Sequence, residues 1–381
     1  MGIAGCRVWA VTTPRLCVWS LGVPVEVTLT ERAGPFVGDR VQELWRRSIA
    51  DDPIIFDNVV RIEVPVPVTE DLHWGDRLAS TITRAAIDAR AGELLMLHAC
   101  GVAEPESGRV IALVGPSGRG KTTAVSTLGR VWGYVSDETV GVDVQGRVYA
   151  HPKPLSVRRG PGAKQLMSAD DLGLVEPPDE LSLGRVVLLE REPDRAAGVA
   201  VEAVPLTEAL AVLTPEMSHL RAWASPLSSF AHLLAETGGA LRLRYREADE
   251  LMFVLPGLLS DLLEVPVWSA DRASPAEHPT EDSAKVGLVG RARFREAVHD
   301  EAGTVLFLDG MSDSRVVLLR GIGPVLWKAA SRPRTVDELV EAVVAAHGSP
   351  PTDPGDLVRT GVAELVGAGV LVIEPGCRDL G

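Results

Sequence analysis

Several patterns that would restrict this chain to a particular class of protein are scarce or missing. The 381 residues include only four cysteines, at positions 6, 17, 100 and 377, with no C-x-x-C pair and no nearby histidine cluster at ligand spacing. This usage indicates reduced thiols in a cytoplasm. No stretch reaches 18 apolar residues, so a membrane-spanning helix is not expected.

The N-terminus also lacks targeting signals. Its short apolar stretch is interrupted at residues 12–15, and residue 6 is Cys where a myristoylation pattern requires Ser or Thr. Positive charge is outnumbered as well, since 38 Lys and Arg residues stand against 52 Asp and Glu residues and the formal net charge is -14. This charge argues against nucleic acid or an anionic membrane as a partner, whereas a compact anionic ligand needs only a local positive site.

The sequence is rich enough in apolar residues, at 46%, to form real cores, and its length suggests two or three domains. Residues 1–75 predict a small α+β region with strands in 23–30 and 59–68 and one helix in 39–50. Residues 76–265 alternate helix and strand patterns, which predicts an α/β core. A helix over 76–91 leads into one strand over 94–104 that feeds a glycine-rich turn.

Residues 266–287 are rich in Pro, Ser, Ala and charge without apolar periodicity, and they predict a linker. Beyond it, residues 288–381 contain three strand patterns followed by three helix patterns. Thr335 and Glu338 predict a capping box on the second helix. This order favours a small winged-helix-like domain.

The glycine-rich turn matches G-x-x-x-x-G-K-[ST], with a β-rich run before it and a helix-compatible run after it. Backbone N–H groups and the helix N-terminus bind phosphate, the lysine neutralises it, and the hydroxyl binds Mg²⁺. The turn therefore predicts binding of a nucleoside triphosphate with Mg²⁺. The residues expected to bind it are Gly115, Pro116, Ser117, Gly118, Arg119, Gly120, Lys121, Thr122 and Thr123.

Other polar residues in this segment have two interpretations each. Asp137 and Glu138 end an apolar run expected on the strand beside the turn, where a carboxylate could bind Mg²⁺ or accept a proton; an acidic cap or solvated turn is the alternative. His98 is either a catalytic residue or a hydrogen-bonded core histidine. A basic loop could clamp phosphate or simply be solvated, and it contains His151, Lys153, Arg158 and Arg159.

The order of LHACGV, GPSGRGKTT, YVSDE and HPKPLSVRRGPG resembles the HPr kinase/phosphorylase family and the HprK-related serine kinases of peptide natural-product pathways. The resemblance covers about residues 76–260 and implies a P-loop fold of the HPr kinase/PEP carboxykinase type. It implies that His98 orients the acceptor or the γ-phosphate, that Lys121 and Thr122 hold phosphate and Mg²⁺, and that Asp137 is the general base. Glu138 stands where the family has a second Asp, so it is the expected further Mg²⁺ ligand.

A second departure lies near Ser156, where the family has a Glu before its IRG-type loop. Its loss predicts a kinase without phosphorolysis. Residues 288–375 resemble the PqqD family, which recognises leader peptides of ribosomally made precursors. That resemblance implies a leader that adds as a β-strand beside Arg315, Val316, Val317, Leu318 and Leu319, with a helix wall at 357–365. The open alternative is that this edge packs on the kinase core.

Together these patterns predict a cytoplasmic, ATP- and Mg²⁺-dependent kinase acting on a hydroxyl, most simply Ser, of a precursor peptide. A non-catalytic ATP-binding adaptor that delivers the peptide is the first alternative. An enzyme that uses ATP to activate the peptide for another modification is the second. HPr kinase relatives are often hexameric, so a homo-oligomer is a further expectation, although no pattern here defines an interface.

Overall fold

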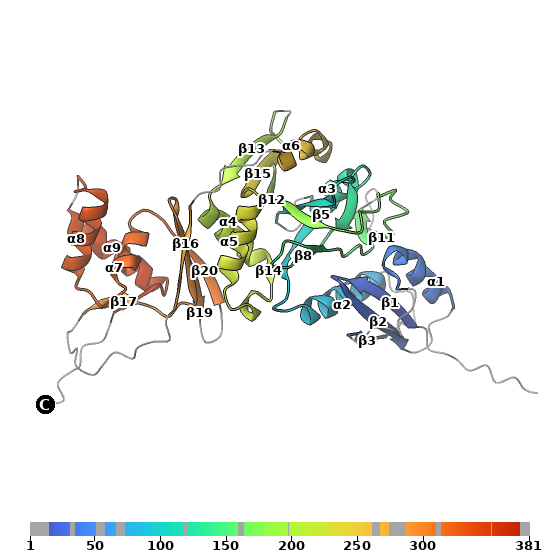
Figure 1. Cartoon of the computed structure of the whole chain (residues 1–381), viewed down its shortest axis with the longest axis horizontal. Helices are drawn as coiled ribbons and strands as arrows, with labels where there is room; N and C mark the ends of the chain where they lie inside the picture. Colours follow the sequence, from blue (N-terminus) through green and yellow to red (C-terminus); the bar gives the residue numbers. More distant parts are fainter. Residues whose placement is uncertain are drawn as a thin grey trace, which may run out of the picture. The chain divides into compact units, whose positions relative to one another are not determined.

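The structure is a computed structural model that describes residues 15–30, 35–50, 58–65, 73–116, 120–158, 164–196, 198–260, 267–273, 287–309, 314–351 and 353–373. The chain forms two compact units. The first contains Met1–Glu202, Glu216–Ala222 and Leu241–Leu262, and the second contains Ala203–Pro215, Trp223–Ala240 and Leu263–Gly381. Two pieces of the predicted 76–265 core therefore pack with the C-terminal part of the chain (Figure 1).

The first unit begins with a three-stranded sheet in the order β1 (Arg15–Ser20), β2 (Val23–Thr30) and β3 (Val60–Pro65), accompanied by α1 (Pro35–Leu44) and η1 (Arg46–Ser48). Strands β1 and β2 are antiparallel, and β2 and β3 are parallel. The sheet shares one apolar core with α2 (Trp74–Ala89), where Ile82 and Trp45 are almost fully buried. The N-terminal region is thus part of the first unit's core.

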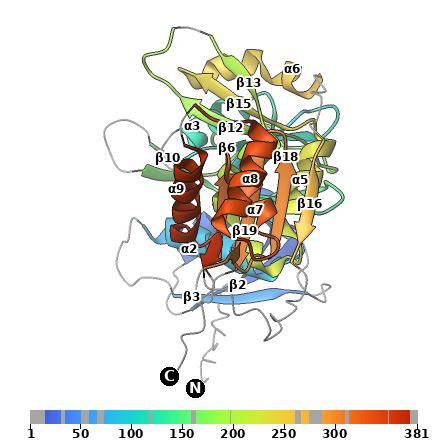
Figure 2. The same cartoon turned by 90° about the vertical axis from the view of Figure 1, so that its left-hand side faces the viewer.

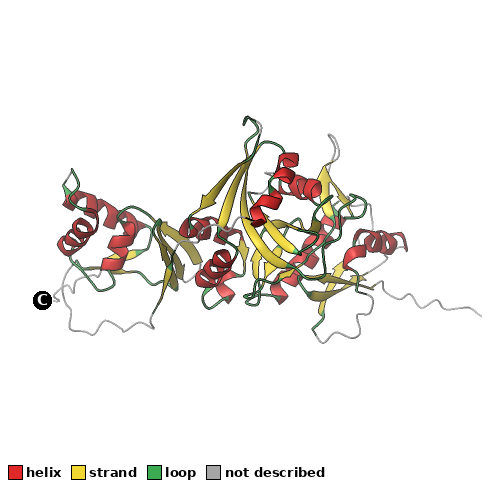
Figure 3. Ribbon diagram, turned by 45° about the horizontal axis from the view of Figure 1, so that its top comes forward, coloured by secondary structure: helices red, strands yellow, loops and turns green. Residues whose placement is uncertain are grey.

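A six-stranded sheet forms the centre of the first unit (Figure 3). Its order is β13 (Ala200–Val204), β15 (Ala240–Tyr245), β12 (Ser182–Arg191), β6 (Arg109–Val114), β5 (Ala99–Ala103) and β7 (Gly133–Ser136). The prediction of one strand over 94–104 was wrong. The chain breaks at His98 into β4 (Leu95–Leu97) and β5, which belong to different sheets, and it is β6 that feeds the glycine turn.

Smaller elements complete the first unit. A four-stranded sheet has the order β14 (Met217–Ser218), β4, β8 (Val140–Val142) and β9 (Val148–Tyr149). Strands β10 (Leu155–Arg158) and β11 (Lys164–Met167) form a separate two-stranded antiparallel sheet. The helices are α3 (Lys121–Leu128), η4 (Leu220–Ala222), η5 (Ala248–Phe253) and α6 (Leu255–Ser260). Cys17 and Cys100 are free thiols, as expected; the other two cysteines lie outside the described residues.

The second unit contains a sheet of order β16 (Ser269–Arg272), β18 (Glu296–Asp300), β19 (Gly303–Asp309) and β20 (Ser314–Leu319). Helices α7 (Gly323–Ala329), α8 (Val336–His347) and α9 (Pro354–Gly367) share a core with one face of it (Figure 2). Helices α4 (Leu206–Leu213) and α5 (Pro226–Glu236) contact β18–β20, with η3 (Thr214–Glu216) following α4. A separate pair joins β17 (Val289–Arg291) to β21 (Leu371–Ile373).

The three strands and three helices predicted after residue 288 are present, but the linker prediction was wrong in part. Residues 269–272 form the edge strand β16, which pairs with β18. Of the predicted linker 266–287, the structure describes only residues 267–273 and 287. No helix in the described ranges combines the length and apolar character that a membrane crossing requires.

Two carboxylates of β18 form hydrogen bonds to the N-termini of α4 and α5, two helices that the sequence had predicted to belong to the 76–265 core. Glu296, fully buried, accepts hydrogen bonds from the Leu227 and Ser228 backbone N–H groups at 2.8 and 3.1 Å at the start of α5. Asp300 accepts from the Thr207 N–H and hydroxyl at 3.0 and 2.8 Å at the start of α4. Helix N-termini need such partners, so α4 and α5 are built into the second unit.

The predicted capping box is present, and it yields a stability prediction. The Thr335 hydroxyl accepts from the Glu338 N–H at 3.3 Å, and the Glu338 carboxylate accepts from the Thr335 N–H at 2.8 Å. Thr335→Ala is expected to lower the free energy of unfolding by about 1 kcal/mol. Urea unfolding should show this loss, whereas Glu341→Ala, an exposed change in the same helix, should not. Equal losses in both variants would contradict the cap's role.

Candidate functional site

The candidate site lies at one edge of the six-stranded sheet. Strand β5 is antiparallel to both β6 and β7, so β6 and β7 run in the same direction and end at the same edge, where β5 begins. Strand β12 is parallel to β6 and also ends there. The residues after β6, after β7 and before β5 therefore lie at the same edge. The prediction that the strand before Asp137 is the direct neighbour of the strand before the glycine turn was wrong, because β5 lies between β6 and β7.

The described glycines at the two ends of the glycine turn have conformations and surroundings that favour glycine. A Cβ at Gly115 would lie 3.1 Å from the Leu189 carbonyl oxygen of β12, so a side chain there would crowd the neighbouring strand. Gly120 has a φ of 100° and caps α3 in the left-handed region, which favours glycine. Thr122 and Thr123 follow Lys121 in the first turn of α3. Ser117, Gly118 and Arg119 lie outside the described residues.

Lys121 folds back over this turn. Its Nζ donates to the Gly115 carbonyl oxygen at 2.7 Å and to the His98 carbonyl oxygen at 3.5 Å, and the residue is 8% exposed. Burial lowers the pKa of the ammonium, and the carboxylates of Glu216, Glu138 and Asp137 oppose this shift. Both members of the acidic pair are thus close enough to Lys121 to act on it electrostatically.

The acidic pair is held by a buried lysine. Lys153 Nζ lies 3.1 Å from Asp137 Oδ1 and 3.3 Å from Glu138 Oε2. The Tyr134 hydroxyl donates to the Lys153 carbonyl oxygen at 3.0 Å and reaches Asp137 Oδ1 at 3.4 Å. Burial raises the pKa of Asp137, with Lys153 opposing the shift, while the two carboxylates outweigh burial and raise the pKa of Lys153. The result is an ion-pair cluster at the same sheet edge as the glycine turn, with Asp137 and Lys153 buried and Glu138 partly exposed.

His98 contributes its backbone to the site. Its N–H donates to the Glu216 carbonyl oxygen at 2.6 Å, and its own carbonyl oxygen accepts from Lys121. Glu216 was missed from the sequence, because it lies far downstream and only the pairing of β14 with β4 brings it to Lys121. His98 therefore links Lys121 to an acidic residue that no local motif indicates.

Arg191 and Tyr245 were also missed. The Tyr245 hydroxyl would lie 3.6 Å and Arg191 Cδ 3.8 Å from a Cβ at Gly120, so both flank the end of the glycine turn. The Arg191 guanidinium forms two hydrogen bonds to the Glu247 carboxylate, at 2.9 and 2.8 Å. Arg191 is the last residue of β12, which is parallel to β6, so a correct prediction of the sheet topology would have placed it at the candidate site.

The interpretation of His151 as a substrate-binding residue was wrong. Its side chain is fully buried, with Nδ1 2.9 Å from the Ser20 hydroxyl and Nε2 3.0 Å from the Thr83 hydroxyl. Burial lowers the pKa of His151 to about 3, and Lys153 adds to this shift. His151 is a neutral core residue that joins β1 and α2 to the first unit. The Arg158 side chain and Arg159 lie outside the described part of the chain.

In the second unit, the expected docking strand forms β20 at one edge of its sheet. Within the described residues β20 pairs only with β19. Arg315 is exposed, residues 316–318 are partly exposed and Leu319 is buried. On the expected helix wall, α9, Leu357 is 40% exposed. The strand therefore has the backbone position that addition of a further strand would need.

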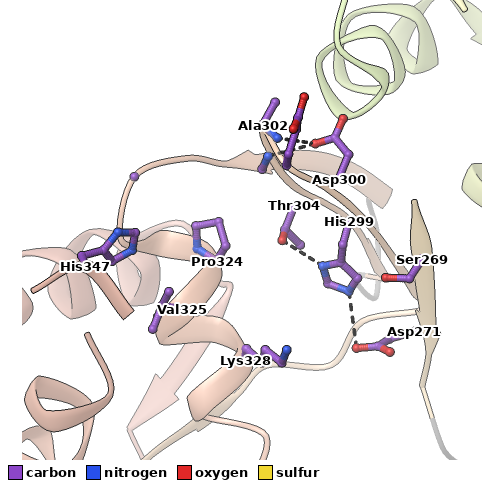
Figure 4. A pocket seen from close by; sticks show the side chains of 13 residues that line it. Ser269, Asp271, His299, Asp300, Ala302, Thr304, Pro324, Val325, Lys328 and His347 are labelled. Carbon is purple, nitrogen blue, oxygen red and sulfur yellow. Dashed lines mark hydrogen bonds and ion pairs between the residues drawn. The ribbon is translucent and has the colours of Figure 1, made fainter. Parts of the chain in front are cut away.

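The second unit also contains a polar pocket of about 430 Å³ that the sequence did not indicate. His299 lies between the Thr304 hydroxyl, 2.9 Å from Nδ1, and Asp271, 3.4 Å from Nε2 (Figure 4). Burial lowers the pKa of His299, with Asp271 opposing it. Lys328 and His347 also line the pocket. The mixture of both charge signs does not select one class of ligand.

No group of three or more His, Cys, Asp or Glu side chains in the described ranges could hold a metal ion by itself. Mg²⁺ is usually bound through one or two carboxylates together with substrate phosphates, so it does not need such a group. The Thr122 hydroxyl at the start of α3 and the carboxylates of Asp137 and Glu138 are oxygen donors of the type that Mg²⁺ prefers. The donor set fits Mg²⁺ that arrives with a triphosphate.

No protein-family model matches the chain, and no curated protein matches it either. One similar solved structure is that of the Hpr(Ser) kinase/phosphatase from Coxiella burnetii. The similarity covers 43% of this chain and 93% of that chain, at 10% sequence identity and a TM-score of 0.22. Such a low TM-score adds no argument for an activity, and the C-terminal resemblance to PqqD stays a prediction.

Proposed function

We propose that the chain is an ATP-dependent kinase that phosphorylates a hydroxyl, most simply of Ser, in a ribosomally synthesised precursor peptide. The observation that carries this proposal is the meeting of a phosphate-binding turn and a buried carboxylate at one sheet edge. Lys121 follows β6, Asp137 follows β7, and the two groups act on each other electrostatically. Phosphoryl transfer uses a phosphate-binding element together with a group that accepts the proton of the acceptor.

In the proposed reaction, ATP binds with its phosphates on the turn, where Lys121 and the first N–H groups of α3 neutralise them. Bound Mg²⁺ would supply neutralisation of the charge on the β- and γ-phosphates, with Thr122 and Glu138 as its protein ligands. The acceptor oxygen forms a bond to the γ-phosphorus as the bond to the bridging oxygen breaks, and ADP leaves. Asp137 accepts the acceptor's proton.

The peptide half of the proposal rests on β20. An extended leader segment that pairs with this edge would gain main-chain hydrogen bonds, and α9 would line one side of it. Tethering of the leader would raise the local concentration of the acceptor at the turn. The leader and the acceptor would then be two segments of one peptide, bound by different units of the chain.

The test is incubation of the full chain with Mg-ATP and any short peptide found to be encoded beside its gene, followed by mass spectrometry of the peptide. A stable phosphopeptide is expected with the wild type and not with Lys121→Met, which keeps side-chain length but removes the charge. Unchanged peptide mass in both reactions would refute the kinase. A peptide modified in another way would favour the enzyme that uses ATP for activation.

One observation favours the adaptor as a second candidate. Lys153 already neutralises part of the acidic pair, which is compatible with a nucleotide site that changes shape without chemistry. Slow nucleotide turnover, combined with leader affinity that depends on ATP, would support the adaptor over the kinase.

A further inference from the structure

The position of Lys153 has a consequence for the acidic pair that the kinase proposal does not contain. The residue is 7% exposed, and its Nζ contacts both Asp137 and Glu138 within 3.3 Å. Its backbone is held on both sides, because its N–H donates to the His151 carbonyl oxygen at 2.8 Å and its carbonyl oxygen accepts from Tyr134. The ammonium is therefore a built part of the site.

Charge determines what this arrangement allows. Within the Lys153–Asp137–Glu138 cluster, two carboxylates and one ammonium leave a net charge of about -1, and the Lys121 ammonium is a further cation nearby. Asp137 and Lys153 are buried, where charges act more strongly than in water. A divalent cation placed between the carboxylates would meet the ammonium at short range. The affinity of carboxylate sites for divalent cations depends on how many negative charges they present. The lysine thus weakens any cation site at the pair.

We propose that Lys153 is a built-in counter-ion that keeps divalent cations out of the Asp137–Glu138 pair until a nucleoside triphosphate is bound. The ion pairs of Lys153 involve Asp137 Oδ1 at 3.1 Å and Glu138 Oε2 at 3.3 Å, so one ammonium lies against an oxygen of each carboxylate. Phosphate oxygens supply the further ligands and negative charge that a cation needs at this edge. The nucleotide half of this inference rests on the proposed function, whereas the counter-ion half does not.

The test measures Mn²⁺ retained by the protein on ultrafiltration, with protein-free solutions as blanks. Wild type without nucleotide should retain little Mn²⁺, and with a non-hydrolysable ATP analogue it should retain Mn²⁺ stoichiometrically. Lys153→Met without nucleotide should bind Mn²⁺ at least about tenfold more tightly than wild type. The double variant Lys153→Met/Glu138→Gln, which restores the wild-type net charge, should return to the wild-type level.

The outcomes separate the two proposals. Wild type that binds Mn²⁺ without nucleotide as tightly as Lys153→Met would overturn the counter-ion role. Wild type that retains no Mn²⁺ with the ATP analogue would overturn the nucleotide half of the inference, while a gain in Lys153→Met would still support the counter-ion. The kinase proposal itself is decided by phosphopeptide formation.

Methionine fits irregular space, but the variant leaves the buried Asp137 carboxylate and the partly exposed Glu138 carboxylate without their lysine, and it can fail to fold. The melting temperatures of Lys153→Met and wild type, measured with and without Mn²⁺, test the counter-ion role even if the variant is destabilised. Mn²⁺ should stabilise Lys153→Met and leave wild type unchanged in the absence of nucleotide. A variant that stays unfolded with Mn²⁺, while the double variant folds, would overturn the proposal.

Discussion

Asp137→Asn is expected to slow phosphoryl transfer by roughly 10²- to 10⁴-fold, the range typical of a lost general base. Asparagine keeps the shape of the side chain and can still accept a hydrogen bond from Tyr134, but it cannot take up the acceptor's proton. Nucleotide affinity should change little, because Asp137 contacts Lys153 rather than the turn itself. Initial rates of phosphopeptide formation and the nucleotide Kd, measured on one preparation, check both statements.

Glu138→Gln is the matched control for this prediction. It removes the neighbouring carboxylate from the same lysine, but Glu138 is assigned to Mg²⁺ and not to the proton. Its activity should fall and then recover as the Mg²⁺ concentration is raised, whereas Asp137→Asn should not recover. An Asp137→Asn enzyme that works at the wild-type rate would remove the base from the mechanism. Loss of nucleotide binding in that variant would instead assign Asp137 to binding.

The features that the sequence predicted correctly depend on residues that are close together in the chain. The glycine turn has its required glycines, lysine and threonine in one stretch, and α3 begins at Lys121 as expected. The Thr335–Glu338 capping box needs only residues three apart, and it is present. In such cases the partners are neighbours in the chain, so local spacing carries the whole interaction.

The break at His98 could not be predicted in this way. Residues 94–103 are apolar or glycine apart from His98, and nothing else in this local pattern separates β4 from β5. The change of sheet depends on a hydrogen bond from the His98 N–H to the Glu216 carbonyl oxygen, which comes from a distant part of the chain. The position of β5 between β6 and β7 is likewise a property of topology, which apolar periodicity does not report.

His151 and Lys153 show the same limit within one basic segment. Both have the character of surface residues in the sequence, and they lie two positions apart. His151 is buried as a neutral imidazole with Ser20 and Thr83 as its hydrogen-bond partners. Lys153 is buried as an ammonium with Asp137 and Glu138 as its ion-pair partners. Distant partners therefore decide whether each residue belongs to the core or to the site.

Acidification is expected to destabilise the first unit through His151. Its pKa is lowered from 6.5 to about 3 in the folded chain, so below pH 6.5 the unfolded chain takes up a proton that the folded chain excludes. The contribution of the neutral imidazole is present in full above 6.5 and is lost progressively as the pH falls toward 3. At pH 5 the loss is about 2 kcal/mol, since one pKa unit corresponds to about 1.4 kcal/mol.

Urea unfolding of wild type and His151→Gln at pH 7.5 and pH 5 checks this expectation. Glutamine has an amide that can hydrogen-bond to Ser20 or Thr83 but does not titrate, so its stability should fall less between the two pH values. His232→Gln, at an exposed position on α5, should keep the wild-type pH dependence. Equal pH dependence in wild type and His151→Gln would mean that the buried imidazole accepts a proton between its two hydroxyl partners without unfolding the unit.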